Sequence, residues 1–230
     1  MSHADEVQNR YSTGEKDFSE AKLTGANLSK TKLAGGNFKR ANLAGANLSE
    51  ANLFGVDLTE ANLIGANLTG ATLMAATLVS TDLSGANLSE ADLSGTSITE
   101  ANLTGANLTG ANLIAANLSM SNLTGANLKK ANLSGLSLLL ATDLSRADLS
   151  STNLIGANLA GAILIEANLT EANLSGANLT GANLTRANLT GANLTRANLC
   201  YASLFETELT DAKITEANLM GAEGLSKDLF

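Results

Sequence analysis

The chain of 230 residues carries a net charge of −8 and has only 3% aromatic residues, with no Trp and no Pro. A globular core of this size normally uses more large aromatic side chains, so the core must be aliphatic. A single Cys excludes a disulfide within the chain and fits a reducing compartment, and no apolar run is long enough to span a bilayer. The N-terminus also lacks the apolar run of a signal peptide. We therefore expect a cytoplasmic protein with no membrane contact.

Residues 1–17 precede the regular part of the sequence, and we expect them to form a partly helical N-terminal cap. Val7 and Tyr11 are the apolar side chains that would pack on the coil below. An uncovered end of a stacked β-structure invites pairing with other chains, so a cap is useful there.

Residues 18–220 repeat one five-residue phrase, seen most clearly as Ala-Asn-Leu-Thr-Gly. There are 25 repeats centred from Phe18 to Leu138 and 16 centred from Leu144 to Leu219. Leucines five residues apart would scatter around an α-helix and would alternate between the two faces of a flat strand. A chain that turns a corner once per repeat buries all of them, so the period predicts a coil around a single core.

Each repeat combines a short extended segment with a tight bend. The residue two before the centre is usually Ala and shares the inward face with the Leu. Asn or Asp between them points outward, where its short side chain can bond to the corner backbone. Ser or Thr and then often Gly complete the bend. Stacked coils should pair as in a parallel sheet, about 4.8 Å apart.

The regular spacing is interrupted once, near residues 139–141, where the centres jump by six residues from Leu138 to Leu144. The inserted residue would make Leu139 and Leu140 part of a bulge in the rod. A bulge in a regular solenoid is a reasonable recognition point. A neutral insertion is the alternative.

Residues 221–230 fall out of step with the repeat, and we expect them to form a C-terminal cap. The large apolar side chains near this end would build a cap, a homodimer contact, or both. They include Phe205, Met220, Leu229 and Phe230.

The repeat resembles the pentapeptide-repeat family, whose consensus is A(D/N)Lxx. Ala26-Asn27-Leu28, Ala101-Asn102-Leu103 and Ala187-Asn188-Leu189 are typical of dozens of matches. The resemblance implies an all-β fold, a right-handed quadrilateral parallel β-helix with four repeats per coil and about ten coils. The entry Tyr11-x-x-Gly14-x-x-x-Phe18 is similar to that of cyanobacterial members.

The residues needed for common catalytic sites are missing from the repeat. His3 is the single His and lies in the expected tail, which leaves no Ser/His/Asp triad and no His-based metal site. Cys200 has no His in its half of the chain to activate it, and we expect it at the surface or at a corner. The glycines follow the repeat and form no phosphate loop. The sequence predicts a protein that is not an enzyme and holds no cofactor or metal.

An acidic band covers residues 50–128, where the sequence has seven acids and no base. Family members that protect DNA gyrase from quinolones mimic DNA, and the local charge density here is comparable to that of DNA, about one charge per 1.7 Å. Counting repeats by fours spreads the acids over all four faces, so solubility is the simpler interpretation. The band consists of Glu50, Asp57, Glu60, Asp82, Glu90, Asp92 and Glu100.

A second surface feature is apolar. The position after each centre is normally Ser or Thr, yet five repeats between Phe54 and Ile114 place a large apolar residue there. Phe54, Met74 and Ile114 are separated by multiples of 20 residues, so they should share one face of a four-sided coil. Exposed apolar clusters can mark partner sites, although scattered surface hydrophobes are ordinary. The other two are Ile64 and Val79.

These patterns favour a non-enzymatic protein–protein interaction module with a rigid rod surface. The resemblance to cyanobacterial members, such as the heterocyst-differentiation regulator type, implies a regulatory role in a cyanobacterium. The candidate binding residues are Phe54, Met74, Ile114, Leu139 and Leu140, and the partner is a protein that the sequence does not identify. Direct nucleic-acid binding is not expected, because no aromatics interleave the basic N-terminal region, which consists of Lys22, Lys30, Lys32, Lys39 and Arg40. A DNA-mimicking binder of gyrase or another topoisomerase and a structural spacer are the alternatives.

Overall fold

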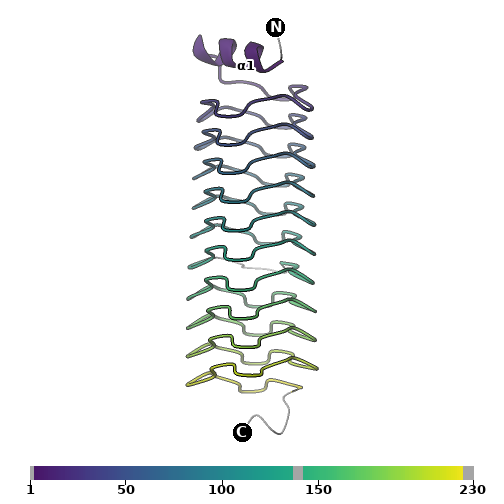
Figure 1. Ribbon diagram of the computed structural model, residues 1–230, viewed down its shortest axis with the longest axis vertical. Helices are drawn as coiled ribbons and strands as arrows, with labels where there is room; N and C mark the ends of the chain where they lie inside the picture. Colours follow the sequence, from purple (N-terminus) through teal and green to yellow (C-terminus); the bar gives the residue numbers. More distant parts are fainter. Residues whose placement is uncertain (1–2, 137–141, 225–230) are drawn as a thin grey trace.

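The protein is a rod of stacked coils with one helix at its N-terminal end, as a computed structural model shows (Figure 1). The structure describes residues 3–136 and 142–224. The helix α1 spans His3–Ser12 and lies across the end of the rod, ahead of the first coil. The coils then follow one another in chain order along the axis.

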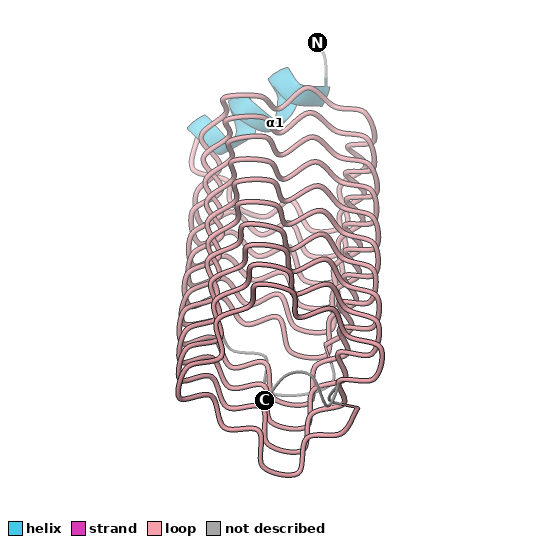
Figure 2. Cartoon of the chain, turned by 60° about the horizontal axis from the view of Figure 1, so that its bottom comes forward, coloured by secondary structure: helices cyan, strands magenta, loops and turns pink. Residues whose placement is uncertain are grey.

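The coils contain 20 residues, with one exception given below, because parallel bridges join one residue of each repeat to the residue 20 positions later. Asn27 pairs with Asn47, and Asn47 pairs with Asn67. Twenty residues hold four five-residue repeats, so each coil has four sides, which Figure 2 shows stacked above one another. Within the described residues each repeat contributes one bridge, so the β-pairing is made of single residues and no longer strands.

We name the four sides after the centres of the first coil. Side A carries Phe18, side B carries Leu23, side C carries Leu28 and side D carries Leu33, each with the centres stacked below it. The corners between them are called A/B, B/C, C/D and D/A. Side B therefore lies opposite side D.

The core is a ladder of leucines interleaved with alanines. Leu68 and Ala66 are completely buried, as are their counterparts in most coils. The backbone of each side is bonded to the coils on both sides of it: the Leu68 N–H donates to the Asn87 carbonyl at 2.7 Å, and the Asn67 N–H donates to the Ala46 carbonyl at 2.9 Å. These bonds run along the rod axis and satisfy the buried backbone groups.

The corner backbone is stabilised by the outward Asn of each repeat, as the sequence predicts. The Asn67 Oδ1 accepts hydrogen bonds from the Thr69 N–H at 3.1 Å and from the Thr69 hydroxyl at 2.7 Å. The next residue closes the corner with a positive φ, whether it is Gly65 at 62° or Glu60 at 58°. Asn, Thr and the corner residue thus form one local turn unit.

Charged corners form ion pairs with the coils above and below them. The Arg146 guanidinium donates to Glu166 at 2.8 Å, and Arg186 donates to Glu206 at 2.7 Å, both along corner B/C. Hydrogen bonds from Arg146 hold the pKa of Glu166 below its ordinary value. Exposed pairs of this kind contribute little to stability, so the hydrophobic core and the backbone ladder dominate.

The register of the ladder changes once. Asn122 bridges Asp143, 21 residues later, and Asp143 bridges Ile163 with the 20-residue spacing restored. One coil therefore takes up one extra residue, and the four sides stay aligned on both sides of it. Leu139 and Leu140 lie outside the described residues.

The helix α1 covers the first coil with apolar and polar contacts. Val7 is buried against the core, and the Tyr11 ring stacks on Phe18 at 6.5 Å between centroids. The Tyr11 hydroxyl donates to the Ala34 carbonyl at 2.6 Å. Both side chains pack on the coil as their apolar character predicts.

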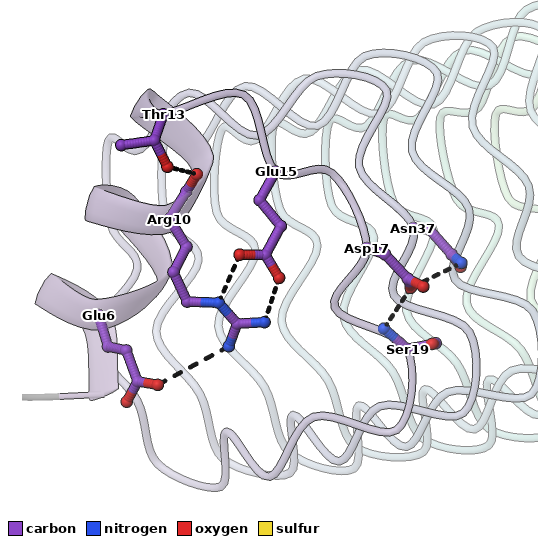
Figure 3. A network of polar contacts seen from close by, with 7 residues as sticks. All are labelled: Glu6, Arg10, Thr13, Glu15, Asp17, Ser19 and Asn37. Atoms are coloured by element: carbon purple, nitrogen blue, oxygen red, sulfur yellow. Dashed lines mark hydrogen bonds and ion pairs between the residues drawn. The ribbon is translucent and has the colours of Figure 1, made fainter.

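A polar network ties the same helix to the segment that follows it (Figure 3). The Arg10 guanidinium donates two hydrogen bonds to the Glu15 carboxylate, the one from Nε measuring 2.8 Å, and it pairs with Glu6 at 3.7 Å. The hydrogen bonds from Arg10 lower the pKa of Glu15. Asp17 accepts from the Ser19 N–H at 3.0 Å, and this bond lowers the pKa of Asp17.

The C-terminal end of the rod is less covered than the N-terminal end within the described residues. Leu209, Ile214 and Leu219 occupy core positions but are only partly buried. Phe205 and Met220 are exposed, at 49% and 61%. Two other residues of the predicted end contact, Leu229 and Phe230, lie outside the described residues.

Candidate functional site

The apolar residues that the sequence singles out stand in one column on side D. Phe54, Met74 and Ile114 are 50%, 38% and 41% exposed, and all occupy the position after a core Leu. Backbone bonds fix the column: the Gly55 N–H donates to the Met74 carbonyl, and the Gly95 N–H donates to the Ile114 carbonyl, both at 2.9 Å. The three side chains therefore project from the same side at successive heights.

A fourth member of the column, Ile155, is missing from the sequence prediction. Its carbonyl accepts from the Gly135 N–H at 3.3 Å, which places it on side D below Ser134, and its side chain is 46% exposed. Counting by 20 overlooks Ile155, because the inserted residue displaces it by one position. A count that carried the insertion forward would have found it.

Over the height of the column, from Gly55 to Gly156, corner D/A carries only Gly or Ala. A Cβ added at Gly55 or Gly95 would meet nothing within 4 Å, so the coils themselves do not require Gly there for space. On corner C/D the equivalent position of the repeat has the same positive φ and holds Glu90 or Lys130. No side chain longer than a methyl group therefore projects along this edge of the column, which is formed by Gly55, Ala75, Gly95, Ala115, Gly135 and Gly156.

The other edge of the column carries acids beside Phe54, Met74 and Ile114, and a base, Lys130, between the coils of Ile114 and Ile155. Corner C/D carries Glu50, which pairs with Lys30 at 3.6 Å, and Glu90. Asp92 lies on side D itself, where its carboxylate accepts from the Ser94 N–H at 3.0 Å and from the Asn112 amide at 3.2 Å. No basic residue occurs between residues 50 and 128 to offset these charges.

Side B, which lies opposite, carries fewer and more widely spaced apolar residues over residues 3–136 and 142–224. It exposes Ile64 at 45% and Phe205 at 49%, seven coils apart on the ladder, and Ile165, two coils before Phe205, is partly exposed. Ile64 has the same repeat position, residue size and exposure as Ile114. The two isoleucines are therefore a matched pair that differ mainly in the side they occupy.

The remaining acids of the band are distributed around the rod. Asp57 lies on side A and Asp82 on side B, while Glu60 and Glu100 share corner A/B. Partial burial of Asp57 favours its neutral form, but hydrogen bonds from Thr59 and the nearby Lys39, at 3.2 Å, leave its pKa below the ordinary value. The seven acids therefore form no single stripe comparable to a DNA strand.

The basic N-terminal region borders a cleft between α1 and the first coils. The cleft has a volume of about 550 Å³. Lys30 and Lys32 line one wall, and Tyr11 with Ser12 lines the other. No aromatic side chain alternates with the lysines, in keeping with the sequence analysis.

Cys200 lies in the turn beside a corner, which is one of the two places expected from the sequence, but it is buried and not exposed at the surface. It occupies the position after a core Leu on side A, in the stack between Thr180 and Met220. Its side chain is smaller than that of Met220, so its neighbours leave only 7% of the residue exposed. The burial removes it further from the role of a surface nucleophile.

The described part of the chain holds neither a cluster of metal ligands nor a helix that could cross a membrane. Across residues 3–136 and 142–224, no three His, Cys, Asp or Glu residues are grouped as metal ligands. No helix in those ranges has the length and apolar character that a bilayer crossing requires.

Known proteins resemble this chain in sequence and in fold. The family model for pentapeptide repeats matches in eight copies that span residues 15–138 and 142–221. HetL, a pentapeptide repeat protein involved in heterocyst differentiation regulation from the cyanobacterium Nostoc sp. strain PCC 7120, is 37% identical. The likeness covers 96% of this chain and 98% of HetL, with a TM-score of 0.84.

A more distant likeness is to QnrB1, a plasmid-mediated fluoroquinolone resistance protein, at 18% identity and a TM-score of 0.59. It covers 86% of this chain and 91% of QnrB1, and at this identity it shows the fold alone. No curated protein matches the chain. The family match extends over nearly all of the repeat region, and the matching family is one of repeats rather than of catalytic domains. This chain belongs to the pentapeptide-repeat family.

Proposed function

We propose that this protein is a non-enzymatic protein–protein interaction module and that the apolar column on side D is its binding face. The observation that carries the proposal is the alignment of Phe54, Met74 and Ile114 on one side of a rigid ladder. Exposed apolar side chains are costly to leave in water, and clusters of them are typical of partner sites. Leu139 and Leu140, which lie outside the described residues, are proposed to extend the contact.

The rod is suited to this role because its surface is held rigid by the ladder. We infer a right-handed rod of about ten coils, with residues 1–17 and 221–230 as its caps around residues 18–220. Binding to such a surface requires little ordering of the rod, which favours affinity. The end contact of Phe205 and Met220 is proposed as a cap or a homodimer contact.

The role that we propose for the protein is a regulatory one in the cytoplasm of a cyanobacterium. Its support is the likeness to HetL, whose described involvement is in heterocyst differentiation regulation. The partner would then be a regulatory protein that meets side D.

The direct experiment is affinity capture from the source cell's lysate with three immobilised proteins. These are the wild type, the Phe54→Ser/Met74→Ser double variant and the Ile64→Ser control on side B. Surface substitutions of this kind change stability by about 0.5 kcal/mol or less, so circular dichroism should show three equally folded proteins. Mass spectrometry then identifies what each protein retains.

We expect a partner that the wild type and Ile64→Ser retain and the double variant loses. Equal capture by all three proteins would contradict the assignment of side D. Capture of no partner by any of them would favour the structural spacer.

The alternative function is a DNA-mimicking binder of gyrase or another topoisomerase, and the observation that favours it is the absence of any base between residues 50 and 128. The scatter of the acids around the rod weighs against it. This alternative expects gyrase binding that collapses with salt and with Glu60→Lys or Glu100→Lys. Gyrase binding that is insensitive to those variants would remove it.

A further inference from the structure

We infer that the segment docking on side D is an amphipathic α-helix with a basic flank, lying along the rod axis, and that Ile155 is its fourth contact. The inference rests on the proposed function, because it names the kind of partner segment that side D accepts. It follows from the hydrogen bonding, the spacing and the charge of the column.

Side D presents no open strand edge to a partner. Its ladder bonds are made between coils, as in the bond from the Leu53 N–H to the Thr72 carbonyl at 2.8 Å and from the Gly55 N–H to the Met74 carbonyl. A partner strand could add only at an end of the rod, where pairing groups are open. Recognition on side D must therefore use side chains, and an α-helix satisfies its own backbone.

The heights of the apolar residues match a helix. Phe54 to Met74 is one coil, Met74 to Ile114 is two, and Ile114 to Ile155 is two more. At the sheet spacing these residues stand at about 0, 4.8, 14.4 and 24 Å. Helix residues i, i+3, i+10 and i+17 stand at about 0, 4.5, 15 and 25.5 Å. The two-coil steps thus correspond to the seven-residue repeat of an apolar helix stripe.

An extended segment fits the same column poorly. Side chains on one face of a strand recur about every 6.7 Å. A strand could therefore not place one side chain opposite Phe54 and the next opposite Met74, which stand about 4.8 Å apart. Helix packing also tolerates the gaps at Ser94 and Ser134, because a stripe need not contact every coil.

The two edges of the column complete the description of the partner. Glu90 and Asp92 border the column between Met74 and Ile114, where no base intervenes, so the part of the helix that faces them should carry Lys or Arg. Lys130 follows on the same corner between the coils of Ile114 and Ile155, so the basic flank ends there. On the other side the Gly and Ala residues of corner D/A allow a helix backbone to approach closely. Corner B/C is also rich in Gly, but the apolar residues of side B are fewer and more widely spaced.

The test uses a synthetic helical peptide rather than the natural partner. The probe is an Ala-based peptide with Leu at positions 1, 4, 11 and 18 and Lys along one flank, matching the spacing above. A control peptide of the same composition has Leu at positions 1, 6, 11 and 16, which scatters the leucines around the helix. Binding is followed by NMR of ¹³C-labelled methyl groups in the full-length protein, with Ile64 on side B as the internal reference.

We expect the methyl signals of Met74, Ile114 and Ile155 to shift with one dissociation constant, while Ile64 stays unchanged. The control peptide should bind at least about tenfold more weakly, and Ile155→Ser should weaken the probe about fivefold. Equal shifts from both peptides, movement of Ile64 along with side D, or no shift at all would overturn the inference.

The result separates the inference from the proposed function. If lysate capture is lost in Phe54→Ser/Met74→Ser but the peptide does not bind, side D remains the interaction face and the helical occupant is wrong. If the peptide binds side D but no capture depends on it, the proposed function fails while the affinity of the column for a basic helix stands.

Discussion

The residue that closes each repeat adopts a positive φ whatever its side chain. Ala75 has a φ of 55° between Gly55 and Gly95 on the same corner. L-residues pay a steric cost in this conformation, while Gly adopts it freely. The hydrogen-bonded ladder imposes the positive φ on the corner residue, whether that residue is Gly or carries a side chain.

Substituting Ala75→Gly should therefore stabilise the rod by about 0.5–1 kcal/mol, despite the greater flexibility of Gly in the unfolded chain. The reverse change, Gly95→Ala, should destabilise it by about 1 kcal/mol, because only the φ and no contact opposes the new methyl group. Urea denaturation of both variants checks the pair. A stabilising Gly95→Ala would contradict the account of the corner.

The buried leucines should be far more sensitive than the surface positions beside them. Leu68→Ala removes a completely buried side chain from a ladder that cannot collapse around the gap, so we expect a loss of about 2–5 kcal/mol. Phe54→Ser on the surface serves as the comparison, with a change of about 0.5 kcal/mol or less. Equal losses in the two variants, measured by urea denaturation, would show that side D carries a structural load.

At the level of elements, the helix α1 is held to the first coil by apolar contacts and to the segment that follows it by an ionic contact. Tyr11 stacks on Phe18, and Arg10 holds the Glu15 carboxylate. The lowered pKa of Glu15 means that the ionised form is favoured in the folded state. Its contribution is complete above the ordinary pKa of 4.5 and is lost as the pH falls through the lower folded value.

Acidification below pH 4.5 should therefore loosen α1 before the coils respond. We expect the amide signals of α1 to move in NMR spectra between pH 7 and pH 3, while those of the central coils stay in place. In Glu15→Gln the helix should already be loosened at pH 7, and its pH response should be smaller, with Asp17 still titrating. An unchanged pH response in Glu15→Gln would contradict the role of the Arg10 contact.

Contacts within a repeat and the burial of apolar residues could be predicted from the sequence, whereas contacts between side chains of different segments could not. The Asn67 bond to the Thr69 backbone and the packing of Tyr11 on the first coil follow from the repeat and from apolar character, and both are confirmed. The Arg10–Glu15 contact and the burial of Cys200 depend on neighbours brought close by folding, which spacing alone does not indicate.

On the scale of the whole molecule, stability is a sum of similar coils and the contacts between them. Such a rod should tolerate the removal of a terminal segment better than the disruption of a central coil. The sequence period predicted the buried Leu ladder, but the four sides rested on the family resemblance until the 20-residue bridges fixed them. Ile155 was missed because one inserted residue shifts every later count.

Deletion of residues 1–16 should leave the central coils folded but uncover Phe18 and Leu23 at the first coil. We expect a small loss in the unfolding midpoint together with self-association, because an open coil end presents apolar surface and unpaired backbone. Circular dichroism and analytical ultracentrifugation check the two effects. Complete unfolding of the truncated protein would contradict the modular account of the rod.

The central claim is that side D, and not the rod surface in general, binds a protein partner. The measurement that tests it most directly compares Ile114→Ser with Ile64→Ser, two variants matched in residue type, repeat position and exposure. Titration calorimetry against the partner identified by capture should show weaker binding, by about tenfold, for Ile114→Ser and an unchanged affinity for Ile64→Ser. Equal affinities for the two variants would contradict the account.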